Sequence, residues 1–308
     1  MFSSQKWTNK AILNDSKIRD LIEHLSKRKL GNKDYPADLM GDAYEILLKK
    51  FADDSKAQAG EFYTPRSVVR LLVHILDPQP GETVYDPACG SGGMLIEAIR
   101  YMHDDSLCCG SIFGQEKNVV NAAIAKMNLF LHGASDFNVM QGDTLRDPKI
   151  LQGGNIAKFD CVIANPPFSL ENWGATEWSS DKYKRNIYGT PSDSCGDYAW
   201  IQHMICSMSS GKGRMAVVMP QGILFRGNQE AEIRKQLVES DLIEAVVTLG
   251  DKLFYGTGLS PCFLIIRRMK QAHHSGRILM IDGSKILTQK RAQNILEEND
   301  IDRLYSLL

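Results

Sequence analysis

The sequence predicts an α/β protein in which a small helical N-terminal subdomain precedes a sheet of seven strands. Seven short apolar runs have the length of buried strands, and stretches with the spacing of amphipathic helices separate several of them. Four successive runs end in polar residues suited to holding a ligand, which is typical of the edge where the strands of an open α/β sheet end. The apolar residues of the first 58 positions follow helical spacing alone.

Composition places the chain among ordinary globular proteins. It has 308 residues, 43% hydrophobic and 24% charged, a length that allows one large domain or two smaller ones. Its seven cysteines are odd in number and form no C-x-x-C pair, which indicates neither a disulfide framework nor a zinc site. We therefore expect a reducing, cytoplasmic setting. No apolar run approaches the ~18 residues of a membrane span, so we expect no membrane partner.

The net charge of −1 is unusual for a protein that binds nucleic acid unaided, because such proteins carry a basic excess. Either the basic residues gather on one face, or a partner supplies most of the phosphate contacts. Two local basic clusters are predicted to be solvated surface. They are Arg267, Arg268 and Lys270, and Lys182, Lys184 and Arg185.

The pattern divides the chain into a helical subdomain at 1–58, an α/β domain at 59–270 and an appendage at 271–308. The subdomain holds two predicted helices, and the appendage holds a strand at 277–282 and a charged helix near 299–308. The apolar residues at helical spacing are Ile18, Leu21, Ile22 and Leu25 in the first helix and Met40, Ala43, Tyr44, Leu47, Leu48 and Phe51 in the second.

The α/β domain opens with Glu61-Phe62-Tyr63-Thr64-Pro65. Thr64 and Pro65 are predicted to be the N-cap and the first residue of a helix over 66–76. Aromatic residues just before a capped helix are typical of a hydrophobic staple, which is the interpretation that these residues alone favour.

A first strand at 83–86 ends in Asp86 and turns through the glycine-rich loop 87–92 into a helix. The glycines let a ligand approach the backbone, and the helix N-terminus offers free N–H groups. Leu95 stands where a dinucleotide fingerprint needs its third glycine, and no Lys-Ser/Thr pair follows as in a phosphate-binding P-loop. An acid before such a loop suits a ligand with a positive amino group.

The next two predicted strands also end in acids. The strand at 111–116 ends in Glu116, and in nucleoside-binding sheets an acid roughly 20 residues after the glycines takes ribose hydroxyls. The strand at 138–141 is followed by Asp143, which could accept from an adenine amino group. Each acid alone could be a helix cap, but three in order at one edge favour a ligand site.

The fourth strand, at 159–163, leads into Asn165-Pro166-Pro167-Phe168. The prolines make the chain leave the strand as a stiff, extended segment. The Asn165 side-chain oxygen and the Pro166 carbonyl can then accept the two protons of an NH₂ group while Phe168 stacks on its ring. The structural alternative is a proline-rich turn after a core strand.

The rest of the domain supplies the remaining strands. Residues 169–194 form a long polar stretch without a period, which is typical of a functional or mobile loop. Helices are predicted at 197–207 and 229–240, and strands at 214–219, 242–249 and 262–266.

Together these motifs resemble the S-adenosylmethionine-dependent amino-methyltransferases of DNA, and within them the modification subunits of type I restriction-modification systems. The resemblance covers nearly the whole chain, although family members generally extend further at both ends. Phe168 stands where many relatives have Tyr, which keeps a stacking surface. The segments that carry it are Gly60-Glu61-Phe62-Tyr63-Thr64-Pro65, Asp86-Pro87-Ala88-Cys89-Gly90-Ser91-Gly92, Gly114-Gln115-Glu116, Gly142-Asp143, Asn165-Pro166-Pro167-Phe168 and Gly256-Thr257-Gly258.

The resemblance implies an S-adenosylmethionine-dependent methyltransferase (Rossmann-like) fold with a mixed sheet, and methyl transfer to N6 of adenine in duplex DNA. It implies double-stranded DNA, a specificity subunit and a restriction subunit as partners, and a reaction without a metal. The implied catalytic residues are Asn165, Pro166, Pro167 and Phe168. The implied cofactor-binding residues are Glu61, Phe62, Tyr63, Thr64, Asp86, Ala88, Cys89, Gly90, Ser91, Gly92, Glu116, Asp143 and Asn165.

Two other functions remain open. A protein N5-glutamine methyltransferase would use the same tetrapeptide, because a side-chain amide also presents a planar NH₂ group. A scaffold that binds the cofactor without turnover is the non-enzymatic alternative. Cys262 opens an apolar strand and is expected to be a buried core residue rather than a cytosine-attacking thiolate. His273 and His274 lack a third metal ligand at suitable spacing.

Overall fold

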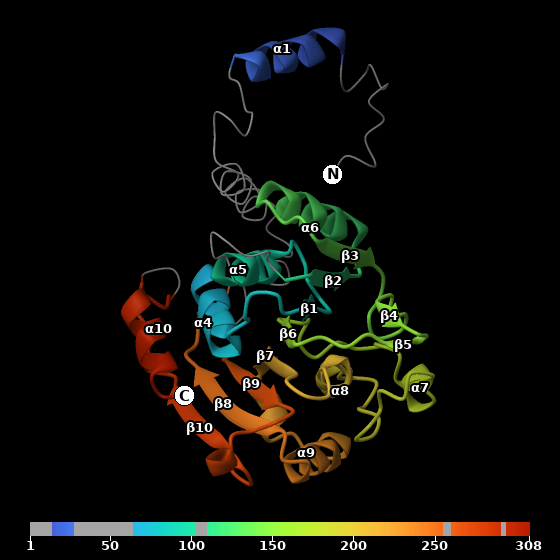
Figure 1. Ribbon diagram of the computed structural model, residues 1–308, viewed down its shortest axis with the longest axis vertical. Coiled ribbons are helices and arrows are strands. Elements are labelled where there is room, and N and C mark those ends of the chain that lie inside the picture. Colours follow the sequence, from blue (N-terminus) through green and yellow to red (C-terminus); the bar gives the residue numbers. More distant parts are fainter. Residues whose placement is uncertain (1–13, 28–63, 103–109, 255–259, 291–293) are drawn as a thin grey trace.

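The computed structural model describes residues 14–27, 64–102, 110–254, 260–290 and 294–308. Within these ranges eight strands form one sheet in the order β10-β8-β9-β7-β6-β1-β2-β3, with helices on both faces (Figure 1). A separate two-stranded hairpin pairs β4 with β5. The strands are β1 (Val84–Asp86), β2 (Ile112–Glu116), β3 (Phe137–Gln141), β4 (Leu151–Gln152), β5 (Asn155–Ile156), β6 (Cys161–Ala164), β7 (Arg214–Pro220), β8 (Ile243–Leu249), β9 (Pro261–Arg267) and β10 (Leu279–Gly283).

The predicted α/β class is confirmed, but the sheet has eight strands instead of seven. The additional strand is β10, which was predicted as part of a C-terminal appendage and which pairs in parallel with β8 from Leu279 to Gly283. The sheet is mixed because β9 runs antiparallel to both of its neighbours, β7 and β8. The other pairs in the sheet are parallel.

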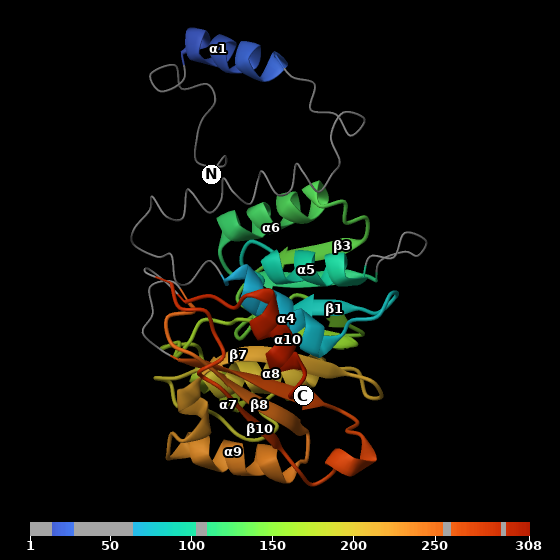
Figure 2. The same cartoon turned by 90° about the vertical axis from the view of Figure 1, so that its left-hand side faces the viewer.

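The helices cover the sheet in two layers. Helices α4, α5 and α10 lie on the face turned to the viewer in Figure 2 and share one apolar core with α6, whereas α8 and α9 pack on the opposite core. The helices are α1 (Asp15–Ser26), α4 (Arg66–Leu76), α5 (Gly93–Met102), α6 (Val119–Leu131), α7 (Ala175–Ser179), α8 (Asp197–Ser207), α9 (Gln229–Glu239) and α10 (Glu298–Tyr305), and two short 3₁₀ helices are η1 (Gln221–Leu224) and η2 (Ala272–His274).

Of the two helices predicted near the N-terminus, the first corresponds to α1. The second, around residues 40–51, lies outside the described residues. At the other end of the chain, the predicted charged helix corresponds to α10, which packs against α4.

The start of α4 differs from the prediction by one residue. The carbonyl of Pro65 accepts hydrogen bonds from Val68 N (2.9 Å) and Val69 N (3.0 Å), so Pro65 is the N-cap and the helix begins at Arg66. Thr64 is therefore not the cap. Its hydroxyl bonds elsewhere, to the end of β6.

Strand β7 lies in the middle of the sheet, and all seven of its residues are buried. A continuous apolar run of this kind is expected where helices cover both faces of a sheet. Arg214, at its start, donates through Nε to the Leu76 carbonyl (2.5 Å) and forms an ion pair with Glu82 (2.6 Å). This guanidinium satisfies a carbonyl at the C-terminus of α4 and so ties that helix to the sheet.

Candidate functional site

The buried carboxyl of Asp86 closes β1 at the carboxyl edge of the sheet. Asp86 is 2% exposed, and its Oδ1 accepts a hydrogen bond from Ala88 N (2.9 Å). Burial raises the pKa of Asp86 to about 8, against the hydrogen bond from Ala88 N, which lowers it, and with a smaller contribution from the negative charge of Glu116. The group is therefore mostly protonated at neutral pH, and a cation brought beside it would favour its ionised form.

The glycine-rich loop 87–92 turns the chain from β1 into α5. Gly90 (φ +53°) and Gly92 (φ +86°) adopt the left-handed conformation that favours glycine. A hydrogen bond from Gly92 N to the Cys89 carbonyl (2.7 Å) closes the turn within the loop, and one from Cys89 N to the Gln115 carbonyl (3.1 Å) holds the loop against β2. The loop is thus a preformed turn with open backbone at the head of a helix.

Glu116, the last residue of β2, connects this loop to β2 through its side chain. Its Oε2 accepts from Gly90 N (2.9 Å) and its Oε1 from Asn118 N (2.7 Å). Each carboxylate oxygen keeps acceptor capacity beyond one hydrogen bond. A ligand hydroxyl could therefore bind Glu116 without displacing the loop.

Asp143 follows β3 and shapes the turn that leads away from it. Its Oδ1 accepts from Leu145 N and Arg146 N, both at 3.2 Å, and its Oδ2 forms an ion pair with Lys117 (2.9 Å). The neighbouring Thr144 hydroxyl donates to the Pro87 carbonyl (2.6 Å). The third acid thus lies in a turn that is hydrogen-bonded to the glycine-rich loop.

Asn165 lies directly after β6, which pairs in parallel with β1 so that Tyr85 is beside Val162. Its Nδ2 donates to the Thr64 hydroxyl (2.9 Å), whereas its Oδ1 is buried and has no hydrogen-bond partner in the described part of the chain. A buried carbonyl without a partner is costly, and such groups frequently mark a place that a ligand fills. This oxygen is the strongest ligand signal at the sheet edge.

The rest of the tetrapeptide carries one aromatic ring, that of Phe168. Pro166 is buried and Pro167 exposed, which fits a segment that leaves the strand and passes to the surface. Phe168 is half-buried and packs on the core that contains α4 and α5. Its ring is therefore fixed by packing on the core while part of it stays accessible.

An ion pair behind the tetrapeptide fixes the backbone where the segment turns. Ser169 has a φ of +50°, which is uncommon for a residue with a side chain. The buried Asp197 of α8 accepts from Ser169 N (2.7 Å) and pairs with Arg226, which also contacts Glu230 (2.7 Å). The sequence gives no signal for this arrangement, because an acid at the start of a helix is expected in any case.

The segment 169–194, predicted to be a functional or mobile loop, is an ordered and packed lobe. Trp173 and Trp178 are each 2% exposed and pack edge to face with ring centroids 5.5 Å apart. With Leu145, Ala199 and Trp200 they form a small apolar core, on which Ala88 of the glycine-rich loop also packs. This cluster therefore packs against both the glycine-rich loop, through Ala88, and the turn after β3, through Leu145.

Arg185 corrects one expectation, because the basic cluster that contains it was predicted to be solvated. Arg185 is 1% exposed, and its guanidinium donates to the carbonyls of Thr144 (2.8 Å) and Leu145 (2.7 Å). Asp181 pairs with it (2.8 Å), and its guanidinium lies 4.4 Å from the Trp178 ring. Arg185 thus holds the Asp143 turn from behind, a role that no local charge pattern reveals.

The structure brings Asp86, the glycine-rich loop, Glu116 and Asp143 into one hydrogen-bonded cluster at the sheet edge, with Thr64 and Asn165 at the end of the neighbouring strand β6. The other motif residues, Glu61, Phe62 and Tyr63 and the glycines at 256 and 258, lie outside the described residues.

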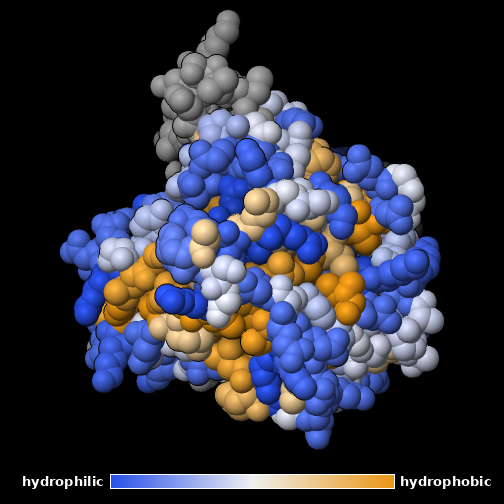
Figure 3. All heavy atoms as spheres, turned by 60° about the horizontal axis from the view of Figure 1, so that its bottom comes forward, coloured by the Kyte–Doolittle hydropathy of each residue, from blue (hydrophilic) through white to orange (hydrophobic). Residues whose placement is uncertain are grey.

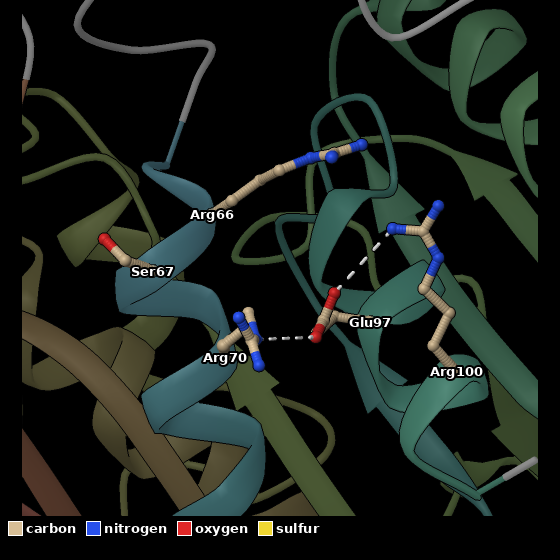
Figure 4. A pocket seen from close by; sticks show the side chains of 5 residues that line it. All are labelled: Arg66, Ser67, Arg70, Glu97 and Arg100. Atoms are coloured by element: carbon tan, nitrogen blue, oxygen red, sulfur yellow. Dashed lines mark ion pairs between the residues drawn. The ribbon is translucent and has the colours of Figure 1, made fainter. Parts of the chain in front are cut away.

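A charged hollow of about 510 Å³ lies between α4 and α5 (Figure 4). Arg66, Arg70 and Arg100 line it together with Glu97, which lies 3.7 Å from Arg70 and 3.9 Å from Arg100. None of the predicted site residues lines this hollow. It is a surface feature beside the sheet edge, not the pocket that the motifs predict.

Two other expectations concern cysteine and metal. Cys262 is fully buried, and burial raises its thiol pKa to about 12, so the prediction of a core residue is confirmed. Across the part of the chain that the structure describes, no group of three or more His, Cys, Asp or Glu side chains could hold a metal ion. In the same part, no helix combines the length and the apolar character that crossing a bilayer requires.

Known proteins match this chain along most of its length. The model of the family described as N-6 DNA Methylase matches residues 35–308. The methylase subunit of the type I restriction enzyme MjaVII from Methanocaldococcus jannaschii is 37% identical over 298 residues, which are 93% of this chain and 50% of the relative. The chain thus spans about half the length of the curated relatives that it matches.

Solved structures agree with the sequence match. The crystal structure of the type I restriction-modification system methyltransferase subunit from Streptococcus thermophilus has a TM-score of 0.83 at 30% identity, covering 95% of this chain and 61% of that one. A protein of Listeria monocytogenes described as a class I S-adenosylmethionine-dependent methyltransferase has a TM-score of 0.68 at 17% identity, covering 88% and 80%. The second likeness concerns the fold alone.

Proposed function

Because the chain belongs to the N-6 DNA methylase family, we propose that it transfers a methyl group from S-adenosylmethionine to N6 of adenine in duplex DNA. It acts as the modification subunit of a type I restriction-modification system. Its partners in this proposal are double-stranded DNA, a specificity subunit and a restriction subunit, in the cytoplasm. The net charge of −1 supports a division of labour in which a partner supplies most phosphate contacts.

The observation that carries the proposal is the buried, unpartnered Oδ1 of Asn165. An amino group of an extruded base would give this oxygen the proton donor that it lacks, and the Pro166 carbonyl would accept the second proton. When both N–H groups donate hydrogen bonds to these two oxygens, the nitrogen is drawn toward a pyramidal geometry. Its lone pair is then less delocalised into the ring and more available to the methyl group. Phe168 would stack on the base and recover part of the unstacking cost of about a few kcal/mol.

The carboxylates at the strand ends fit the cofactor. Asp86 suits the ammonium of its amino-acid part, Glu116 its ribose hydroxyls and Asp143 its adenine amino group, while the open backbone of the loop 87–92 shapes the pocket. When bound, S-adenosylmethionine supplies an electrophilic methyl group on a sulfonium centre. The chain's own contribution is to position the amine and to present fixed dipoles to it.

The test is co-expression with the specificity subunit of the same system, followed by incubation with duplex DNA and methyl-labelled S-adenosylmethionine. We expect N6-methyladenine by mass spectrometry of the nucleosides. Label in glutamine residues of protein would instead support the glutamine methyltransferase, and cofactor binding without transfer would support the scaffold.

Asn165→Ala is the matching variant. Because it removes a proton acceptor that acts on the amine and leaves the strand-end acids intact, we expect kcat to fall about 10²- to 10³-fold while cofactor affinity stays within about threefold. Isothermal calorimetry and single-turnover transfer separate the two quantities. A parallel loss of cofactor binding would mean that Asn165 holds the cofactor rather than the amine.

A further inference from the structure

Phe225 carries the most exposed aromatic ring among the residues that the structure describes. It directly follows η1 and is 73% exposed, whereas Phe168 is half-buried. A single exposed apolar side chain is common on protein surfaces and needs no explanation by itself. Phe225 differs from such residues in its place at the sheet edge and in how its backbone is held.

Phe225 and the tetrapeptide 165–168 follow neighbouring strands. β6 and β7 pair in parallel, with Ala164 beside Val217, so the segments after the two strands leave the sheet at the same edge. β7 ends at Pro220, and η1 follows without a break. The exposed ring therefore belongs to the edge at which the proposed function places the target base.

A single carboxylate connects the two segments. Asp197 accepts a hydrogen bond from Ser169 N (2.7 Å) and pairs with Arg226, whose Nη1 also donates to the Ser169 hydroxyl (3.4 Å). Ser169 directly follows Phe168, and Arg226 directly follows Phe225. Asp197 thus holds together the residues next to the two phenylalanines.

Other side chains fix the backbone around the exposed ring. Ile223 is buried, and its carbonyl accepts from the Tyr198 hydroxyl (2.7 Å) and from Arg234 Nη1 (3.2 Å). The same Nη1 of Arg234 donates to the Arg226 carbonyl (2.8 Å). The backbone on both sides of Phe225 is therefore held by side chains of α8 and α9, while the ring stays accessible.

A fixed, exposed ring at this edge suits the bases of the duplex. Extrusion of an adenine leaves the bases that flank it without a stacking neighbour, and aromatic side chains can stack on such bases. A ring that is 73% exposed stands out from the surface and does not line a pocket, which favours the duplex over the extruded base. The exposed residues 227–229 are uncharged, so they do not repel phosphate groups.

We propose that Phe225 binds the DNA duplex by stacking on a base that flanks the extruded adenine, in the space that the adenine leaves. This role rests on the proposed function, which brings the adenine to Asn165 and Phe168. Phe168 stacks on the target base, and Phe225 stabilises the duplex from which that base has been extruded.

Phe225→Ala tests the proposal, because the loss of an exposed side chain leaves the core intact. In the complex with the specificity subunit, we expect the dissociation constant for the duplex to rise about tenfold, while KM for S-adenosylmethionine stays within about threefold. Phe225→Trp keeps an aromatic surface and should bind within about threefold of the wild type. Phe130→Ala, the same substitution at a position of α6 that is 68% exposed, is the matched control.

Abasic nucleotides identify the base on which the ring stacks. When the flanking base that Phe225 contacts is removed, wild type and Phe225→Ala should bind with dissociation constants within about twofold of each other, because the variant then loses nothing. When the target adenine itself is removed, the tenfold difference should persist, because the space between the flanking bases remains. Fluorescence anisotropy with each of the three duplexes measures these ratios.

The possible results separate the explanations. An unchanged dissociation constant in Phe225→Ala would overturn the proposal, and so would a difference that survives the removal of either flanking base. A difference that disappears only when the target adenine is absent would overturn it too, because Phe225 would then stack on the extruded base. Absence of adenine methylation by the wild-type complex would instead reject the proposed function itself.

Discussion

Asp86 combines a carboxyl group with an environment that disfavours its charge. A ligand ammonium placed against it would restore the ionised form, so binding is coupled to the release of a proton at neutral pH. Without a ligand, the same burial lowers the stability of the folded protein at high pH, where Asp86 must carry its charge in a buried position. Both effects follow from the pKa of about 8 and can be measured separately.

The first prediction concerns cofactor affinity. Below the free-state pKa of about 8 for Asp86, the affinity for S-adenosylmethionine should rise about tenfold per pH unit from pH 6 to pH 7.5. The rise should level off near pH 8, where half of Asp86 is already ionised in the free protein and about half of an α-amino group of pKa ~7.8 has lost its proton. Calorimetry in buffers of different ionisation enthalpy should detect release of about one proton at pH 7. Asp86→Asn should abolish that release, and a flat affinity profile in the wild type would contradict the assignment.

The second prediction concerns stability. Because the folded-state pKa of Asp86 lies above the unfolded value of ~3.9, its contribution to stability decreases as pH rises from about 4 to about 8 and is constant above that. Asp86→Asn carries no charge, so its melting temperature should exceed that of the wild type by about 5 °C or more at pH 8 and by little at pH 4.5. If Asp86→Asn and the wild type melt at the same temperature at pH 8 as well as at pH 4.5, Asp86 is not buried in solution.

Sequence reasoning succeeded at residues whose chemistry is local. Asp86 was predicted at a strand end, and Cys262 in the core, because each belongs to a short pattern with a direct physical meaning. Thr64 was assigned to the cap of α4, since its actual partner is 101 positions away. Arg185 was taken for surface because the carbonyls that bind it, those of Thr144 and Leu145, are about 40 positions distant.

Among the elements, the turn after Phe168 depends on a helix that follows it by nearly 30 residues. The Asp197 carboxylate at the start of α8 holds Ser169 N and pairs with Arg226, so α8 determines how the tetrapeptide leaves the sheet. The arrangement thus fixes the backbone just after Phe168, whose ring packs on the core that contains α4 and α5.

The third prediction follows from that arrangement. Asp197→Asn removes the charge opposite Arg226 and should lower the free energy of unfolding by about 2 kcal/mol, less than for a fully buried pair because the Arg226 side chain is 29% exposed. It should also weaken stacking on Phe168, seen as a smaller fluorescence increase of 2-aminopurine at the target position. Glu232→Gln, an exposed acid of α9, is the control. If the fluorescence increase in Asp197→Asn equals that of the wild type, stacking on Phe168 does not depend on the ion pair between Asp197 and Arg226.

Helix α6 shows why some elements escape a pattern-based prediction. Its buried face carries Ala125 and Leu129, and its outer face carries Val119, Met127 and Phe130, which are 61%, 50% and 68% exposed. Apolar residues all round leave no 3.6-residue period to recognise. Helices α4 and α8 were predicted within a residue of their observed bounds, each from the residues at its start, which are Thr64 and Pro65 for α4.

At the scale of the whole molecule, the sequence predicted the fold class and most strands but not how the strands are joined. Pairing order depends on contacts between distant segments, and the number seven was wrong because nothing local shows that β10 pairs with β8. The space-filling view shows apolar patches between hydrophilic residues on the lower face (Figure 3).

The fourth prediction concerns DNA binding by the isolated chain. With 36 basic and 37 acidic residues, the chain should bind duplex DNA weakly at 150 mM salt, and addition of the specificity subunit should tighten binding at least ~100-fold. Fluorescence anisotropy over a series of salt concentrations measures both the affinity and the number of phosphate contacts. Tight, salt-dependent binding by the chain alone would show that its basic residues suffice.

The antiparallel strand β9 lies between β7 and β8, although the ribosome makes it after both. Until residue 267 has been synthesised, β7 and β8 have no shared partner, and each offers an open hydrogen-bonding edge of apolar sequence. The nascent chain therefore carries a hazard of wrong strand pairing from the synthesis of β8 until that of β9. The middle of the sheet is completed only when β9 enters between two strands that were made before it.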